Sequence, residues 1–195
     1  MSVKTKWSIN RDGSEIAFKV AHIMFSNVKG IFKNFDANIE TSGDDFATAK
    51  IAFWINLSSI ETGDKARDEH LKSPEFFDIK KYKKITFVSD SFKKSDKKDN
   101  YILWGYLTMK GVTHRIKLEV YSAGIEIDVY GHEKADFYIS GKLSRKDWGL
   151  NWNVAGFPGS VMGSDEAYIC CNLKLLKSEE EEFALETVQS MEDKN

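Results

Sequence analysis

Apolar and polar residues alternate one by one through most of this chain. Between positions 113 and 123, for example, Ile116, Leu118 and Val120 alternate with charged residues. Because successive side chains of a β-strand point to opposite faces, this period indicates strands with one buried face. We expect strands in the segments that share the pattern: 7–10, 15–20, 28–40, 50–57, 85–92, 101–109, 113–123, 134–143 and 167–175. Gly30, inside one of them, marks a bulge or a close approach of two segments.

Only two segments have helix-like sequence. Residues 62–72 predict a short polar helix that ends before Pro74. A second helix is expected to begin at Ser178, because Glu181 follows at the spacing of a capping box, and to run to about Met191. Many strands with few helices indicate an antiparallel sandwich or a closed barrel.

The charge of the chain is unevenly distributed. The formal net charge is −2, while residues 179–195 contain seven acidic residues and one lysine, or −6, which leaves +4 for residues 1–178. A mildly basic body with an acidic tail lacks the strong, clustered positive charge of nucleic-acid-binding domains, so we expect no nucleic-acid partner.

The cysteines and the beginning of the chain bear on its location. Cys170 and Cys171 are neighbours within a predicted strand and point to opposite faces, so we expect no disulfide between them. Strand-like sequence begins at once, without an apolar leader. We therefore expect a cytoplasmic protein, or a periplasmic one if a leader has been removed.

The side chains expected to face the interior are large and apolar. They can pack against one another as a filled core, or they can line a ligand cavity, and the alternation is the same in both cases. Phe76 and Phe77 follow the short helix, and one of them is expected to plug the mouth of a barrel. Our candidate ligand-binding residues are Phe18, Val20, Phe53, Ile55, Phe76, Phe77, Ile116, Leu118, Phe137, Ile139 and Ile169.

Residues with catalytic or metal-binding chemistry do not form a recognisable pattern. The histidines at positions 22, 70, 114 and 132 lack metal-ligand spacing. Arg67, Asp68 and His70 resemble acid–base machinery, but a short helix that covers a barrel end needs similar residues for ion pairs, and we favour that role. We expect no enzyme, metal or cofactor. The basic run at Lys80, Lys81, Lys83 and Lys84 is either a solvated loop or a transient contact with anionic membrane.

Several stretches, in order, resemble the YceI-like family, also called polyisoprenoid-binding proteins. The stretches are residues 7–10, 14–22, 28–35, 62–63, 67–78, 85–89, 105–113, 144–150 and 165–167. The strongest match is R-D-E-H-L-K-S-P-E-F-F-D at 67–78. The chain departs from the family at Lys83, where proline is common after tyrosine, in its acidic tail, and in lacking the leader that many members carry.

The resemblance implies an antiparallel lipocalin-like barrel. Together with the strand and helix patterns, it predicts an all-β fold of about eight strands with a short helix and a C-terminal helical tail. We expect a lipid-binding barrel domain over residues 1–177 and an acidic tail over 178–195. The resemblance also implies a homodimer and a bound isoprenoid or other long amphiphile, which the protein would carry, store or sequester. Two alternatives remain open, an enzyme that acts on a lipid-like substrate and an interaction module built on a filled barrel.

Overall fold

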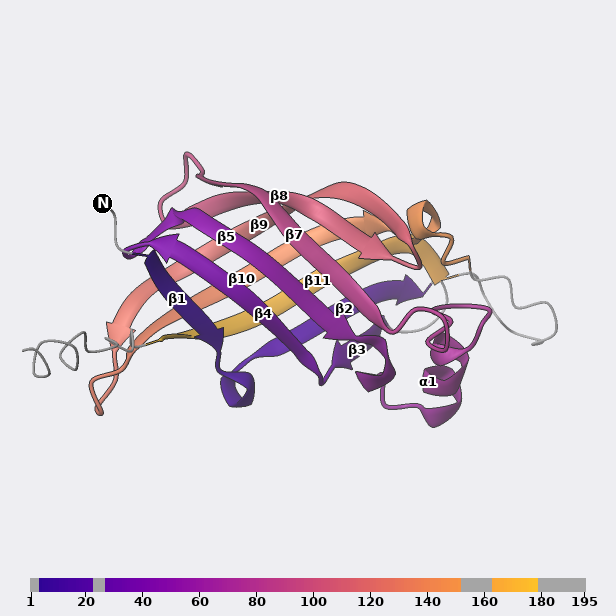
Figure 1. Ribbon diagram of the computed structural model, residues 1–195. Helices are drawn as coiled ribbons and strands as arrows, with labels where there is room; N and C mark the ends of the chain where they lie inside the picture. Colours follow the sequence, from indigo (N-terminus) through magenta and orange to yellow (C-terminus); the bar gives the residue numbers. More distant parts are fainter. Residues whose placement is uncertain (1–3, 23–26, 152–162, 179–195) are drawn as a thin grey trace, which may run out of the picture.

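Eight strands close into an antiparallel barrel in the computed structural model, which describes residues 4–22, 27–151 and 163–178 (Figure 1). The ring order is β1–β4–β5–β7–β8–β9–β10–β11, and β11 pairs with β1 to close it. The strands are β1 (Lys4–Ile9), β2 (Glu15–His22), β3 (Val28–Phe32), β4 (Phe35–Ser42), β5 (Asp45–Asn56), β6 (Ile60–Glu61), β7 (Lys84–Lys94), β8 (Asn100–Met109), β9 (Val112–Ile127), β10 (Glu133–Ser144) and β11 (Gly163–Lys177). The predicted all-β barrel of about eight strands is confirmed.

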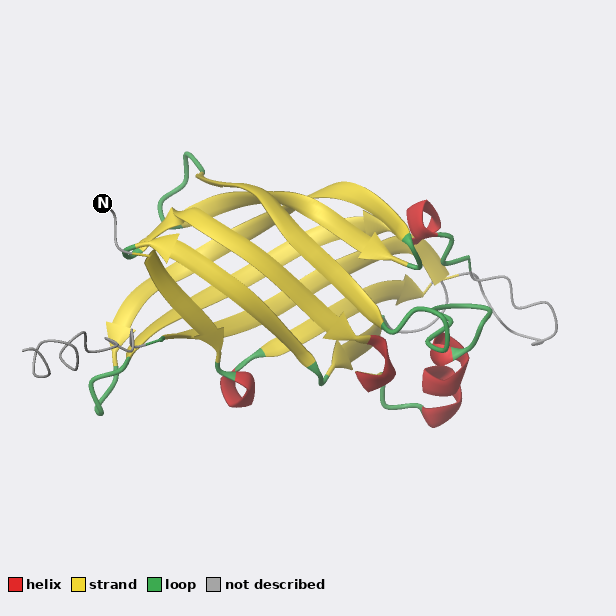
Figure 2. Cartoon of the chain, in the orientation of Figure 1, coloured by secondary structure: helices red, strands yellow, loops and turns green. Residues whose placement is uncertain are grey.

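Strands β2, β3 and β6 extend the sheet beyond the closed ring. Strand β11 pairs with β1 through residues 175–177 and with β2 through residues 163–172, so β1 and β2 follow one another along the same edge of β11. Strand β3 pairs with β2 in the same way that β4 pairs with β1. The barrel is therefore elongated by this side branch, and the extension lies towards the end that carries the helix (Figures 1 and 2).

One predicted strand was wrong in its continuity. Residues 28–40 were expected to form a single extended segment, but the structure divides it into β3 and β4. At the break, the Lys33 backbone N–H donates to the Ser59 carbonyl over 3.2 Å, and the Asn34 N–H donates to the Ser59 hydroxyl over 3.0 Å. These bonds to η2 (Leu57–Ser59) replace the ladder bonds locally. Strand β6, which has two residues, was not predicted.

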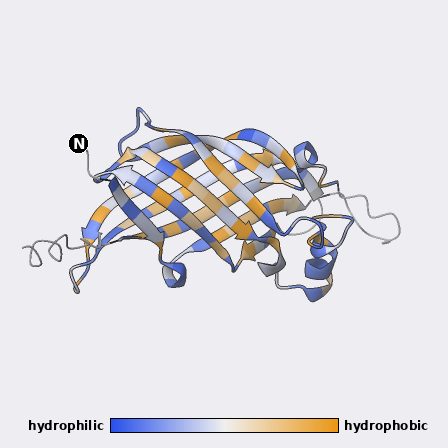
Figure 3. Ribbon diagram, viewed as in Figure 1, coloured by the Kyte–Doolittle hydropathy of each residue, from blue (hydrophilic) through white to orange (hydrophobic). Residues whose placement is uncertain are grey.

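The alternation of side chains was predicted correctly. On β9, Ile116, Leu118 and Val120 are buried inside the barrel, while Arg115 and the other charged residues between them are exposed. Figure 3 shows the same alternation as bands of apolar and polar residues along the strands. The core is thus the interior of the barrel, as one-sided burial of antiparallel strands requires.

The helix α1 (Lys65–Lys72) lies at one end of the barrel (Figure 2). It begins where the Asp64 carboxylate accepts a hydrogen bond from the Arg67 backbone N–H over 3.1 Å, and this bond lowers the pKa of Asp64. It ends at Ser73, directly before Pro74, which disfavours a helical residue in front of it. None of the described helices is long and apolar enough to span a membrane.

The predicted C-terminal helix falls on residues 179–195, which lie outside the described residues. That helix and the division of the chain at residues 177 and 178 therefore stay predictions. The last described contact before this region is made by Ser178, whose backbone N–H donates to the Lys6 carbonyl over 2.9 Å. The barrel is complete at this point of the chain.

Candidate functional site

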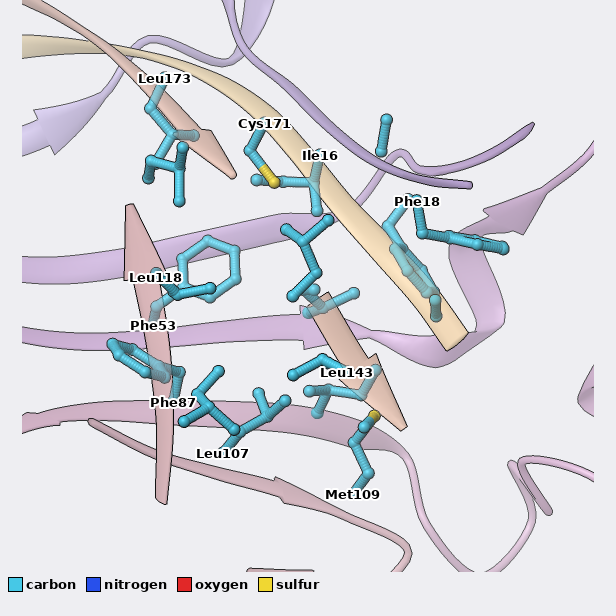
Figure 4. A pocket seen from close by; sticks show the side chains of 18 of the residues that line it. Ile16, Phe18, Phe53, Phe87, Leu107, Met109, Leu118, Leu143, Cys171 and Leu173 are labelled. Atoms are coloured by element: carbon cyan, nitrogen blue, oxygen red, sulfur yellow. The ribbon is translucent and has the colours of Figure 1, made fainter. Parts of the chain in front are cut away.

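The interior of the barrel holds a cavity of about 240 Å³. An engineered apolar cavity of about 150 Å³ stays dry and binds benzene, so a void of this size has room for an organic ligand. Its wall includes side chains from the barrel strands and from α1. Figure 4 shows the apolar side chains of this wall directed towards a common interior.

All eleven candidate residues lie on the wall of this cavity. Strands β2, β5, β9, β10 and β11 contribute nine of them, and Phe76 and Phe77 contribute the other two from the segment after α1. Both phenylalanines are buried, and their rings meet edge to face at 5.0 Å. The structure thus brings together every residue that the sequence selected. Contact between these residues and a ligand stays a prediction.

Several inward side chains on the cavity wall are only half-buried. Ile139, Leu143 and Ile169 point inwards and line the cavity, yet they are incompletely covered by other side chains. Phe18 on β2 and Phe53 on β5 are also half-buried and line the cavity. A residue in a filled core contacts neighbours on all sides, so incomplete cover of inward residues is what an unoccupied interior predicts.

Three inward glycines allow large side chains to lie along the wall. A Cβ atom at Gly141 would lie 2.5 Å from Leu118 Cδ2, and one at Gly30 would lie 2.2 Å from Phe18 Cζ. A Cβ atom at Gly105 would lie 2.3 Å from Phe87 Cζ. In each of the three pairs, the large side chain lies over the glycine of the neighbouring strand. The close approach predicted at Gly30 is confirmed, whereas Gly105 and Gly141 were missed.

An aromatic cluster fills the end of the barrel opposite α1. The Phe46 ring lies 4.8 Å from the Trp7 ring and 4.7 Å from the Phe137 ring. The Trp7 indole N–H donates to the Thr41 hydroxyl over 2.9 Å, so its polar atom is satisfied within the cluster. Phe46 and Phe137 line the cavity and are buried. These two rings therefore bound the void at this end.

The sequence missed other wall residues, although their alternation could have indicated most of them. Phe87 and Leu107 lie in predicted strands and share the inward face, but we did not select them. Trp148 lies outside any strand, in η3 (Arg145–Trp148), and donates from its indole N–H to the Leu107 carbonyl over 3.3 Å. The further missed wall residues include Phe32, Phe46, Phe92, Leu103 and Met109.

Two arginines belong to the wall, and both are engaged with the protein. Nε and Nη2 of Arg145 donate to the Ser164 carbonyl over 3.0 and 2.6 Å, and burial lowers the pKa of this guanidinium. Nε and Nη2 of Arg67 donate to the Thr62 hydroxyl and carbonyl over 2.8 and 2.9 Å. These bonds hold the two side chains in place at the α1 end of the interior.

The described part of the wall contains few groups that could act as an acid, a base or a nucleophile. Among the described wall residues there is no carboxylate and no histidine. Cys171 does line the cavity, but burial raises the pKa of its thiol to about 12, so the thiol is protonated at neutral pH. The described wall offers hydrocarbon contact and little else.

The polar residues of the helix motif bind one another. The buried Asp68 carboxylate accepts hydrogen bonds from the Thr62 N–H and hydroxyl over 2.9 and 2.6 Å. His70 Nε2 lies 3.4 Å from a Glu75 carboxylate oxygen, just after the helix. Within the described residues no histidine, cysteine or carboxylate group is arranged as a metal site. The His22 side chain lies outside the described part of the chain.

The sequence of this barrel is similar to those of known proteins. A family model described as a YceI-like domain matches residues 7–175. The chain belongs to this family. A UPF0312 protein of Staphylococcus epidermidis is 35% identical over 159 residues, which cover 81% of this chain and 90% of the relative. The YceI-like resemblance of the sequence motifs is therefore confirmed.

Solved structures share the YceI-like barrel. A YceI protein of Campylobacter jejuni matches with a TM-score of 0.70 and 28% identity, over 81% of this chain and 90% of that one. BcnA of Burkholderia cenocepacia matches with a TM-score of 0.72 and 20% identity, over 85% and 98% of the two chains. A polyisoprenoid-binding domain of Saccharophagus degradans matches with a TM-score of 0.62 and 14% identity, over 88% and 98%. The last two similarities establish the fold alone.

Proposed function

We propose that this YceI-like barrel binds the long apolar chain of a lipid in its interior, as a carrier, storage or sequestering protein. The observation that carries the proposal is the cavity of about 240 Å³ with a wall of apolar side chains. Each CH₂ group that moves from water into such a cavity contributes about 0.8 kcal/mol, so a long chain binds without many polar contacts.

An isoprenoid-type chain is the ligand class we favour. The Saccharophagus degradans protein that shares the fold is a polyisoprenoid-binding domain, which supports this choice. The arginines of the wall lie at the α1 end, while the Phe46–Phe137 pair bounds the opposite end. We therefore place the polar head of the ligand towards α1 and the end of its chain towards Phe46.

Binding without catalysis is part of the proposal. The described wall lacks a carboxylate or imidazole that could act as a general base, and the Cys171 thiol is held neutral by burial. The network of Asp68, Arg67 and Thr62 fixes α1 and leaves the carboxylate bound to Thr62. The void in the barrel also argues against an interaction module with a filled interior.

Mass spectrometry of an organic extract of the purified protein tests the proposal. We expect a defined lipid in the wild-type extract and little of it in Ala167→Trp. Ala167 is a small residue on the cavity wall, so an indole at this position would occupy the space of the ligand. Ala123→Trp is the matched control, because Ala123 is exposed on β9 and is not among the wall residues.

Titration with long-chain alcohols and isoprenols extends the test to protein purified without a ligand. Circular dichroism checks that both tryptophan variants keep the barrel. Wild-type protein that neither carries a lipid nor binds any chain of the series would overturn the proposal. Equal binding by wild type and Ala167→Trp would place the ligand outside the barrel.

A further inference from the structure

A row of lysines lies beside the cavity at the α1 end of the barrel. Lys80, Lys81, Lys83 and Lys84 are exposed, and they follow closely after Phe76 and Phe77 on the cavity wall. Residues 79–84 contain these four lysines and no acidic residue. The segment therefore carries four positive charges, whereas the whole chain has a formal net charge of −2.

The lysine row forms no ion pair within the described residues, although a hydrogen bond with Tyr82 and, to a lesser extent, the charge of the nearby Asp78 carboxylate raise the pKa of Lys81. None of the four lysines forms an ion pair with a described carboxylate, in contrast to many other lysines of the barrel, such as Lys134 with Asp128 at 2.7 Å. A carboxylate partner would cancel the field of each lysine locally. The row therefore presents its positive charge to solvent, where attraction of an anionic surface extends over about 10 Å at 0.1 M salt.

The segment that carries the lysines is fixed to the barrel. The Ile79 N–H donates to the Lys72 carbonyl of α1 over 3.2 Å, and the Leu57 N–H, directly after β5, donates to the Lys83 carbonyl over 3.0 Å. A Cβ atom at Gly111 would lie 3.3 Å from the Tyr82 ring, so the β8–β9 turn packs against the middle of the row. Lys110, the residue before Gly111, thereby joins the four lysines. We call these five lysines the basic patch.

Two aromatic side chains accompany the basic patch. Lys81 Nζ lies 5.1 Å from the centre of the Tyr82 ring, and Lys84 Nζ lies 5.5 Å from the centre of the Trp54 ring. Tyrosine and tryptophan are enriched where proteins meet the head groups of a bilayer, and lysine is attracted by anionic lipids there. Lysines accompanied by tyrosine and tryptophan, next to an apolar cavity, fit a membrane surface. Binding of nucleic acid would not need the apolar cavity.

We propose that the basic patch docks the barrel onto an anionic lipid bilayer, with the α1 end of the cavity facing the membrane. In this orientation, a long apolar chain that leaves the cavity at the α1 end would pass into the bilayer without crossing water. Docking is separate from ligand binding, since the patch lysines are not part of the cavity wall.

Vesicle co-sedimentation tests the docking surface. We expect wild-type protein to bind phosphatidylcholine vesicles that contain phosphatidylglycerol, to ignore pure phosphatidylcholine, and to detach in high salt. The variant Lys80→Gln/Lys81→Gln/Lys83→Gln/Lys84→Gln should bind the anionic vesicles on the order of a hundredfold more weakly, because each lysine near the surface contributes severalfold. Its ligand binding in solution should not change.

Strand β7 supplies a matched control. Its other end and the following loop carry Lys93, Lys94, Lys97 and Lys98, which are also exposed. This group lies roughly 33 Å away along the strand, beyond the opposite end of the barrel (Figure 1). Four glutamines at these positions give the same net charge, and we expect anionic vesicle binding within a few-fold of wild type.

Several outcomes would overturn the docking proposal. One is the absence of wild-type binding to anionic vesicles, and another is an equal loss in the two quadruple variants. Displacement of the protein from vesicles by stoichiometric duplex DNA would assign the patch to nucleic acid. Loss of vesicle binding in Val129→Ser/Tyr130→Ser, with the patch intact, would move the contact to the exposed β9–β10 turn, where these side chains are 93% and 84% exposed.

Discussion

The space inside the barrel depends on single residues that lack a side chain. Leu118 covers Gly141, and Phe87 covers Gly105, so neither large side chain projects straight across the interior. The two sites differ in what surrounds the missing Cβ atom. At Gly141 the nearest atom is the mobile end of Leu118, whereas at Gly105 the Val88 carbonyl oxygen also lies at 2.5 Å. A side chain can move away, but a paired strand backbone resists displacement.

Gly141→Ala and Gly105→Ala should therefore have different effects. In Gly141→Ala we expect Leu118 to shift towards the adjoining cavity, with less than about 1 kcal/mol lost in unfolding free energy and a severalfold weaker affinity for a long-chain alcohol. In Gly105→Ala, the backbone clash should cost about 1–3 kcal/mol. Urea unfolding and ligand titration measure both quantities. Equal losses of stability in the two variants would contradict this account of the wall.

The helix α1 is held by a compact polar network around one threonine. The Thr62 side chain accepts from Arg67 and donates to the buried Asp68 carboxylate, and the Asp64 cap fixes the beginning of the helix. The same segment continues into Phe76 and Phe77, which line the cavity. The helix therefore positions one end of the wall, although it contributes few wall residues itself.

Thr62→Val should loosen this end of the barrel. The substitution keeps the shape of the side chain but leaves Arg67 Nε without its hydroxyl acceptor and takes the hydroxyl donor from the Asp68 carboxylate. Both charged groups keep their bonds to the Thr62 backbone, so the loss is that of hydrogen bonds to charged groups. We expect it to lower the unfolding free energy by about 1.5–3 kcal/mol and to speed dissociation of a bound chain. Thr108→Val is the control, because its hydroxyl pairs with Thr113 at an exposed position. If the bound chain dissociated from Thr62→Val as slowly as from the wild type, α1 would not control exit from the cavity.

The strands differed in how far their sequence predicted them. On β9, alternation alone identified the inward residues, because the strand is straight in register across residues 112–121. The break between β3 and β4 was invisible, since Lys33 and Asn34 are ordinary strand-surface residues and the Ser59 contacts come from a distant part of the chain. The cavity could not be predicted either. Alternation shows that one face of a strand is buried, but not whether inward side chains from opposite walls of the barrel contact one another. That depends on closure of the ring and on glycines such as Gly141.

Closure of the whole barrel depends on a short pairing between its first and last strands. Strands β1 and β11 share three register pairs, from Trp7 with Lys177 to Ile9 with Leu175. Leu175 is also buried in the core. The C-terminal residues of β11 thus close the ring, while residues after Ser178 are not needed for any of these pairs.

Truncation at two neighbouring positions should separate these roles. We expect a chain that ends after Ser178 to keep the unfolding free energy and ligand affinity of the full chain. A chain that ends after Lys174 loses the β1–β11 pairs and the buried Leu175, which should cost about 3 kcal/mol or more. Thermal unfolding measures the difference. If the chain that ends after Ser178 failed to fold, residues 179–195 would belong to the barrel domain.

The dependence of affinity on chain length tests most directly whether the barrel interior is the binding site. The measurement is a calorimetric titration with straight-chain alcohols that differ by one CH₂ group and share one polar head. The account predicts that Kd falls about fourfold for each added CH₂ until the chain reaches the Phe46–Phe137 end, and then becomes constant. Ala167→Trp should bring that limit to shorter chains, while Ala123→Trp should not. An affinity that does not change with chain length, or that follows the polar head alone, would contradict a lipid chain buried in the barrel.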